Sequence, residues 1–295
     1  MHGVLKYPGS KRTLAPKVVQ ILGRNGPPEV YAEPFLGSGA VFFEAQRSWG
    51  ASVRCVLSDA CGPLMNVWGA IQSDPQGVAE ALGTILSQDV TEDYYNHQRA
   101  LFNGRERLGP FGDSFTVRAA RALWLNKACF NGLWRFSARS GFNVPWGKRS
   151  TVRGLPSLAD LRALSSALEG VFLKSGHWRE VLPRLQGSRE GAYMGIYLDP
   201  PYTPSDTSAA KKAFVSYGAP GPAWTFADTI ALVEWCEARA RFGGLRVVLS
   251  YLDDPLLVPV LQTGGWTVEY VEMPRTISRN GAERKPVREI LATLG

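Results

Sequence analysis

The sequence predicts an α/β fold, in which an open, mostly parallel sheet is interrupted by a long helical insertion. An apolar run of strand length over 192–198 ends directly on Asp199-Pro200-Pro201-Tyr202. An earlier apolar stretch from Val30 leads into a glycine turn over 37–39 and then a helical pattern. Strand, glycine turn and helix in that order are typical of parallel α/β sheets. About 130 residues separate the second strand, 53–57, from the strand before Asp199, far more than one crossover needs.

The tetrapeptide Asp199-Pro200-Pro201-Tyr202 carries the clearest chemical signal. Ligands of open α/β sheets bind outside the carboxyl ends of the strands, where this turn is expected. Two prolines remove two backbone donors and fix φ, so the turn is stiff. The Asp199 carboxylate, the Pro200 carbonyl and the Tyr202 ring then suit a planar substrate with an amino group, and we predict these three residues to be catalytic. The alternative is a turn that merely stops a strand.

The amino-terminal part predicts a site for a nucleoside-bearing cofactor. A turn-rich basic stretch over 5–11 precedes a helix over 14–22, and alone it reads as a solvated arm. The glycine turn lets the backbone approach a ligand, and the helix that follows offers unpaired N–H groups. The second strand ends at Asp59, which lies 59 − 39 = 20 residues past Gly39, a spacing at which an acidic residue meets a ribose hydroxyl. The alternative is a tight turn with a solvated aspartate.

The segment 61–168 is predicted to be an inserted target-recognition domain, whereas 1–60 and 169–295 form the catalytic domain. Helical patterns cover 63–72, 75–86, 92–102 and 117–127. Aromatic residues, amides and cations then alternate over about 129–150, with turn signals that predict a β-hairpin joined near Ser140-Gly141. A β-ribbon fits the major groove of DNA. The side chains predicted to reach phosphates or base edges are Asn131, Arg135, Arg139, Asn143, Lys148 and Arg149. The alternative is an ordinary surface hairpin.

The carboxyl-terminal part completes the predicted sheet. The stretch 203–224 reads as a lid, in which Phe214 and Tyr217 close over a bound base. A helix begins at Thr225, where Asp228 completes a capping box. A buried strand over 245–251 follows, and 266–273 with 287–294 form an antiparallel pair. The loop between that pair holds four cations: Arg275, Arg279, Arg284 and Lys285.

Composition narrows the class of protein. There are 33 Lys and Arg against 26 Asp and Glu, which gives a net charge of +7 and is compatible with a nucleic-acid partner. The four cysteines show no CxxC spacing, so we expect no metal site and no disulfide framework. No apolar run is long enough to span a membrane, and no signal peptide is evident. We expect a soluble cytoplasmic protein, in a bacterial cell or encoded by a phage that acts in one.

Taken together, these motifs carry a family resemblance. The chain resembles the Dam-type DNA adenine-N6 methyltransferases, in which the glycine motif precedes the recognition insert and the Asp-Pro-Pro-Tyr motif follows it. The stretches that match are 5–11, 33–39, Ser58-Asp59, 131–135 with 142–145, 199–202 and 275–281. They occur in the family's order and span nearly the whole chain.

The resemblance implies a Rossmann-like S-adenosylmethionine-dependent methyltransferase sheet and a site-specific enzyme that methylates N6 of a flipped-out adenine in duplex DNA. The cofactor contacts that it implies are Tyr7, Lys11, Phe35, Gly37, Ser38, Gly39, Asp59 and Asp199. It also implies DNA contacts from the hairpin, above all Arg135. Family members commonly modify GATC, but Phe130 and Lys148-Arg149 depart from some relatives, which leaves the recognition sequence open. We expect a monomer, or a dimer on DNA, acting alone or with a restriction enzyme.

Two other functions stay open at this point. An RNA adenine-N6 methyltransferase shares the Asp-Pro-Pro-Tyr motif and would label RNA in preference to duplex DNA. A nucleic-acid-binding relative that has lost catalysis would retain the fold without turnover. The intact glycine motif, Asp59 and Asp199 argue against such decay.

Overall fold

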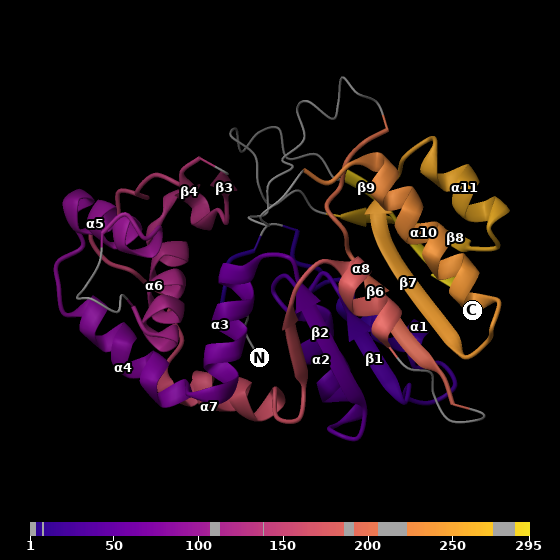
Figure 1. Cartoon of the computed structure of the whole chain (residues 1–295), viewed down its shortest axis with the longest axis horizontal. Coiled ribbons are helices and arrows are strands. Elements are labelled where there is room, and N and C mark those ends of the chain that lie inside the picture. The colour runs from indigo at the N-terminus through magenta and orange to yellow at the C-terminus, as the bar shows by residue number, and fades with distance from the viewer. Residues whose placement is uncertain are drawn as a thin grey trace.

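The computed structural model describes residues 4–7, 9–106, 113–137, 139–185, 192–205, 223–273 and 287–295. These residues contain a seven-stranded sheet and a separate two-stranded hairpin (Figure 1). The strands of the sheet are β1 (Val30–Glu33), β2 (Arg54–Asp59), β5 (Phe172–Ser175), β6 (Met194–Leu198), β7 (Leu245–Leu252), β8 (Thr267–Met273) and β9 (Val287–Leu294). The hairpin is made of β3 (Phe136–Ser137) and β4 (Gly141–Phe142).

The helices fall into two groups, one packed against the sheet and one that forms a helical part beside it (Figure 1). Those of the sheet are α1 (Ala15–Leu22), α2 (Ala40–Trp49), α8 (Trp178–Val181), α10 (Phe226–Ala240) and α11 (Leu257–Thr263). Those of the predicted insert are α3 (Gly62–Ser73), α4 (Pro75–Leu86), α5 (Glu92–Phe102), α6 (Phe115–Ala128) and α7 (Leu158–Ala167). The described residues also contain two short 3-10 turns, η1 (Phe130–Gly132) and η2 (Leu182–Arg184).

The strand order explains where a ligand can bind. The order across the sheet is β5-β2-β1-β6-β7-β9-β8, and the first five of these strands are parallel. The chain steps outward from β1 to β2 and β5, and then crosses to the other side for β6 and β7. The switch point therefore lies between the carboxyl ends of β1 and β6. β9 is antiparallel to β7 and to β8, which confirms the predicted antiparallel pair.

Two hydrophobic clusters cover the two faces of the sheet because side chains alternate along each strand. On β1, Val30 and Ala32 belong to the cluster that includes α10 and α11, whereas Tyr31 belongs to the one that includes α1, α2 and α3. All five residues of β6 are buried, as expected for a central strand covered on both faces. This packing fixes the turn that begins at Asp199.

The helical insert shares its core with the sheet. α3 packs against β2 and β5 on one side and against α6 on the other. A single cluster of buried residues continues from α1 and α2 into α6, and it includes the buried rings of Trp68 and Trp124. The four predicted helices of this region are confirmed as α3 to α6. α7 and the edge strand β5 were not predicted.

The predicted hairpin is confirmed, although each of its strands has only two residues. Phe136 pairs with Phe142, and both rings pack against Trp134 and Phe102. The predicted lid residues Phe214 and Tyr217 lie outside the described residues, as do the cations of the loop over 275–286. No helix in the described ranges is long and apolar enough to cross a membrane.

Candidate active site

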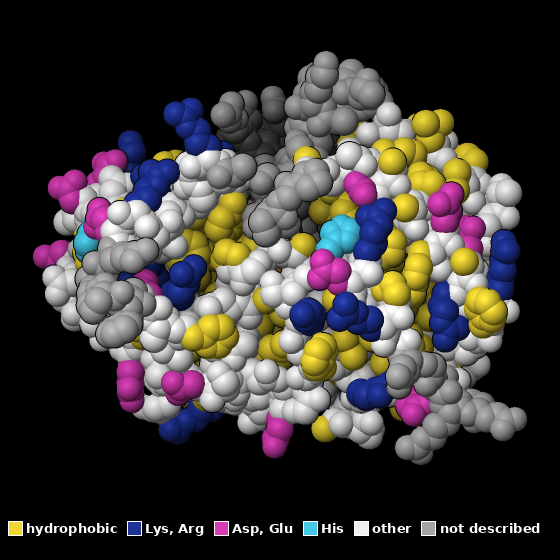
Figure 2. All heavy atoms as spheres, viewed as in Figure 1, with side chains coloured by type: hydrophobic (Ala, Val, Ile, Leu, Met, Phe, Trp, Pro, Cys, Tyr) yellow, Lys and Arg dark blue, Asp and Glu magenta, His cyan; other side chains and the backbone are white. Residues whose placement is uncertain are grey.

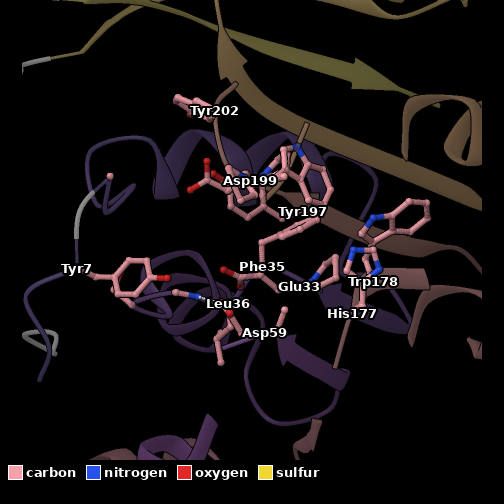
Figure 3. Close-up of a pocket in the computed structure, with 18 of the residues that line it drawn as sticks. Tyr7, Glu33, Phe35, Leu36, Asp59, His177, Trp178, Tyr197, Asp199 and Tyr202 are labelled. Atoms are coloured by element: carbon pink, nitrogen blue, oxygen red, sulfur yellow. Dashed lines mark hydrogen bonds between the residues drawn. The ribbon is translucent and has the colours of Figure 1, made fainter. Parts of the chain in front are cut away.

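A cavity of about 1060 Å³ opens at the carboxyl edge of the parallel strands. Its wall includes Glu33 at the end of β1, Asp59 at the end of β2, His177 after β5 and Asp199 after β6 (Figure 3). Phe136 of the hairpin also lines it, so the predicted recognition element forms part of the same wall. Figure 2 shows the surface hollowed between the helical part and the sheet part, with hydrophobic side chains exposed in the hollow.

The glycine turn is held in place by Asp59. The Asp59 Oδ2 accepts a hydrogen bond from the main-chain N–H of Gly37 at 3.0 Å, and Oδ1 accepts from the N–H of Cys61 at 2.9 Å. Gly37 has φ +48°, and a Cβ at this position would lie 3.1 Å from Tyr7 Cε1. A glycine is therefore required for Tyr7 to pack on the turn and project into the cavity (Figure 3).

The other predicted cofactor residues differ in their access to the cavity. Ser38 lines it, and its hydroxyl lies 3.0 Å from that of Ser10. Phe35 lines it as well and meets the ring of Trp224 edge-on at 5.4 Å. Gly39 is the N-cap of α2 with φ +68°, and it is not among the residues of the cavity wall in the described part of the chain. Gly39 thus serves the turn itself.

An aromatic corner of the cavity was missed by sequence reasoning. The His177 ring lies 6.1 Å from that of Trp224 and 5.8 Å from that of Trp178, and all three residues line the cavity. His177 and Trp178 follow β5, an edge strand whose side chains are mostly exposed. Because no apolar run marked β5, nothing in the sequence pattern drew attention to the residues after it.

Six carboxyl side chains line the cavity: Glu33, Asp59, Glu180, Asp199, Asp228 and Glu289. Burial raises the pKa of Glu33 to about 8 and that of Asp59 to about 6. Burial also raises the pKa of Asp199 and of Glu289, and the nearby Lys11 ammonium opposes both shifts. Carboxylates gathered in a low-dielectric site are stabilised by a cationic ligand.

The predicted catalytic turn lies at one end of this wall. Asp199 Oδ1 forms an ion pair of 3.2 Å with Lys11 Nζ, which is 5% exposed. The Lys11 ammonium also lies 4.7 Å from the centroid of the Tyr202 ring, and Tyr202 packs on Tyr251 at 5.1 Å. Lys11, predicted as a cofactor contact, is thus placed beside the predicted catalytic residues.

The hairpin presents its predicted DNA contacts in two groups. Arg135 donates from Nε to Asn143 Oδ1 at 2.7 Å and from Nη2 to the Asn143 carbonyl at 3.1 Å. Asn143 thus contacts Arg135 in the hairpin. The remaining predicted contacts have exposed side chains: Asn131, Arg139, Lys148 and Arg149.

The described residues contain no group of three or more His, Cys, Asp or Glu side chains arranged to hold a metal ion. The four cysteines are free and buried.

The strand order and the cavity at the carboxyl ends of the parallel strands define a Rossmann-like α/β fold, a class that includes many methyltransferases. Within that class, the chain belongs to the D12 class of N6 adenine-specific DNA methyltransferases, whose family model matches residues 7–253. The predicted family, enzyme class and methyl donor are thereby confirmed.

Two proteins of similar sequence support the same assignment. The chain is 30% identical over 291 residues to a DNA adenine methylase of Vibrio cholerae, covering 98% of this chain and 94% of the relative. It is 28% identical over 298 residues to a type II methyltransferase of Lactococcus lactis subsp. cremoris, covering 98% and 93% respectively. Among solved structures, a precorrin-6y C5,15-methyltransferase of Geobacter metallireducens aligns with a TM-score of 0.36 and 11% identity, covering 99% of this chain and 98% of that one.

Proposed function

We propose that the chain methylates N6 of an adenine that has been flipped out of duplex DNA, with Asp199, Pro200 and Tyr202 as its catalytic residues. The observation that carries this proposal is the position of Asp199. Asp199 lines the same cavity as the glycine turn and Phe136 of the hairpin, which supports a single site for cofactor and target base beside the proposed DNA-reading element.

The chemistry of the wall fits the cofactor. S-adenosylmethionine supplies an electrophilic methyl group on a sulfonium, and it carries an ammonium as well. The carboxylates of Glu33 and Asp59 provide negative charge for these cations. The aromatic corner of His177, Trp178 and Trp224, extended by Phe35 on Trp224, provides a surface for a purine ring. The residues that we propose to hold the cofactor are Tyr7, Lys11, Phe35, Gly37, Ser38, Asp59 and Asp199. Gly39 acts indirectly, by closing the turn.

Asp199 and Pro200 prepare the amine for reaction. The lone pair of an exocyclic adenine amine is delocalised into the ring, so the amine is a poor nucleophile. A carboxylate oxygen of Asp199 and the carbonyl of Pro200 accept its two N–H groups and favour the pyramidal nitrogen of the transition state. Fixed dipoles and charges that match the developing charge need no reorganisation during the reaction.

Tyr202 holds the base once it leaves the duplex. The target amine is inaccessible inside the duplex, so the nucleotide must be extruded into the cavity. The Tyr202 ring follows Asp199 by three residues and is buttressed by Tyr251, which places an aromatic surface beside the amine acceptor. Its pKa is raised well above the usual value by burial and by Asp199, so it stays a neutral phenol.

The insert supplies DNA contacts and specificity. We propose that 61–168 acts as the target-recognition domain on the catalytic units 1–60 and 169–295. Within it, Arg135 reads a guanine, while Asn131, Arg139, Lys148 and Arg149 contact the DNA from exposed positions. GATC is the recognition sequence that we expect. The chain acts as a monomer in the cytoplasm, alone or beside a restriction enzyme.

Methyl transfer from labelled S-adenosylmethionine tests this proposal directly. The protein is incubated with unmethylated genomic DNA or with RNA, and the labelled nucleoside is identified after digestion. We expect label in N6-methyladenine of DNA, and sequencing of the modified positions gives the recognition sequence. Label in RNA alone would instead support an RNA adenine-N6 methyltransferase. Binding of cofactor and DNA without label in either would support a relative that has lost catalysis.

A further inference from the structure

Glu289 reaches the catalytic turn from the end of the chain. It lies near the start of β9, opposite Leu252 of β7 in the antiparallel register. Because β9 runs against the parallel strands, its beginning meets their carboxyl ends at the cavity. The Glu289 side chain lines that cavity and is only 12% exposed.

Its carboxylate contacts two residues of the catalytic region. The Tyr202 hydroxyl donates a hydrogen bond to Glu289 Oε2 at 3.0 Å. The same oxygen lies 3.7 Å from Lys11 Nζ, which is itself 3.2 Å from Asp199 Oδ1. The Lys11 ammonium therefore lies between two carboxylates, those of Asp199 and Glu289. Tyr202 contacts both Lys11 and Glu289, so the four side chains form one connected cluster.

The position of Lys11 creates a conflict with the proposed reaction. Its ammonium lies against Asp199 and over the Tyr202 ring, which are the two groups assigned to the amino group and the ring of the target adenine. A base that enters must compete with this ammonium. A buried ammonium is stable away from Asp199 only where another anion receives it. In the described part of the chain, Glu289 is the other carboxylate within ion-pair distance of Lys11.

We propose that Glu289 is a positioning residue for methyl transfer, which rests on the function proposed above. Glu289 holds the Tyr202 ring through its hydroxyl, and it receives Lys11 when the target base enters, so that Asp199 accepts the amino group of the base. Glu289 thereby holds the Tyr202 ring on which the base stacks and also keeps Asp199 free to accept the amino group of the base. Burial and the Asp199 charge raise the pKa of Glu289 while Lys11 lowers it, in keeping with a carboxylate that depends on this ammonium.

Three substitutions separate the two roles. Glu289→Gln keeps an oxygen that accepts from Tyr202 but removes the charge that attracts Lys11. Glu289→Ala removes both, and Tyr202→Phe removes only the hydroxyl. Glu272→Gln is the matched control, because this exposed carboxylate lies on the neighbouring strand β8 and outside the cavity wall. Thermal unfolding verifies that each variant is folded.

Base capture and chemistry are measured separately. A duplex with 2-aminopurine in place of the target adenine reports base extrusion by fluorescence, and single-turnover transfer to the normal duplex reports chemistry. We expect Glu289→Gln to lose less base capture than Glu289→Ala, because it still accepts from the Tyr202 hydroxyl, while it transfers methyl about tenfold more slowly than the wild type. Glu289→Ala and Tyr202→Phe should both lose base capture, and their double variant should lose no more than either single variant. Cofactor affinity should stay within about threefold in all of them.

The outcomes distinguish this inference from the proposed function. If the wild type transfers methyl and Glu289→Ala transfers it equally fast, the role of Glu289 is overturned while the proposed function stands. Additive loss of base capture in the double variant would have the same meaning. A loss of cofactor affinity in Glu289→Gln would also overturn it, since the residue would then belong to the cofactor site. Absence of transfer by the wild type on any DNA would refute the proposed function itself.

Discussion

We predict that Glu33 makes cofactor binding dependent on pH. It ends β1, is 2% exposed, and accepts a hydrogen bond from the Tyr31 hydroxyl at 2.8 Å. No lysine or arginine of the described residues lies within ion-pair distance of it. Burial raises its pKa to about 8, and the Asp199 and Asp59 charges act in the same direction. Without a cationic ligand, Glu33 is therefore protonated at neutral pH.

A cationic cofactor reverses this preference and releases the proton. Below a pH of about 8, part of the binding free energy is used to ionise Glu33, and about two pH units below that pKa the cost is about 2.7 kcal/mol. The affinity for S-adenosylmethionine should therefore rise by up to about 100-fold as the pH rises from about 6 to about 8. Glu33→Gln cannot ionise and should lose this part of the pH dependence.

Calorimetric titration measures the effect. Titrations near pH 7 in buffers of different ionisation enthalpy should show close to one proton released by the wild type and fewer by Glu33→Gln. The raised pKa also predicts that the cofactor-free protein loses unfolding free energy as the pH rises from about 4.5 to about 8, because the folded state prefers the protonated carboxyl. An identical pH dependence of affinity in the two proteins would refute this reasoning.

Three further substitutions test the turn and the hairpin. Arg135→Ala should relax sequence preference by about 1–3 kcal/mol in methylation assays on single-mismatch duplexes, whereas equal weakening on every sequence would mark a phosphate contact. Asn143→Ala should shift preference in the same direction but less, since it frees the Arg135 guanidinium without removing it. Gly37→Ala should lower cofactor affinity by at least about tenfold, because strain at φ +48° adds to contact with Tyr7. Gly50→Ala, at φ +74° with nothing within 4 Å, is its control and should cost only stability.

The central strands and the turns after them could be predicted because their signals are local. β6 is buried along its whole length, so it reads as an unbroken apolar run that ends at Asp199. In the turn over 37–39, Gly37 and Gly39 adopt the left-handed backbone that favours glycine, and a helix begins directly after them. Asp59 was recognised by its spacing, and the structure adds that it braces the turn through Gly37.

The parts that escaped prediction depend on tertiary contacts. β5 has mostly exposed side chains, so its strand is evident only from its pairing with β2. Glu289 lies 87 residues beyond Tyr202, and the antiparallel register of β9 alone brings it to the cavity. Asn143 was predicted to contact DNA, and the structure adds that its side-chain oxygen accepts a hydrogen bond from Arg135. Such pairings between distant segments leave no periodic pattern in the sequence.

Single-turnover methyl transfer by Asp199→Ala tests the central claim most directly. The substitution leaves Lys11 with a carboxylate partner in Glu289, so the variant should fold and should still bind DNA. Loss of the amine acceptor should slow transfer by at least about 100-fold at saturating cofactor and DNA, as the removal of one group that stabilises a transition state typically does. A transfer rate within about threefold of the wild type would contradict the assignment of Asp199 as the acceptor of the adenine amino group.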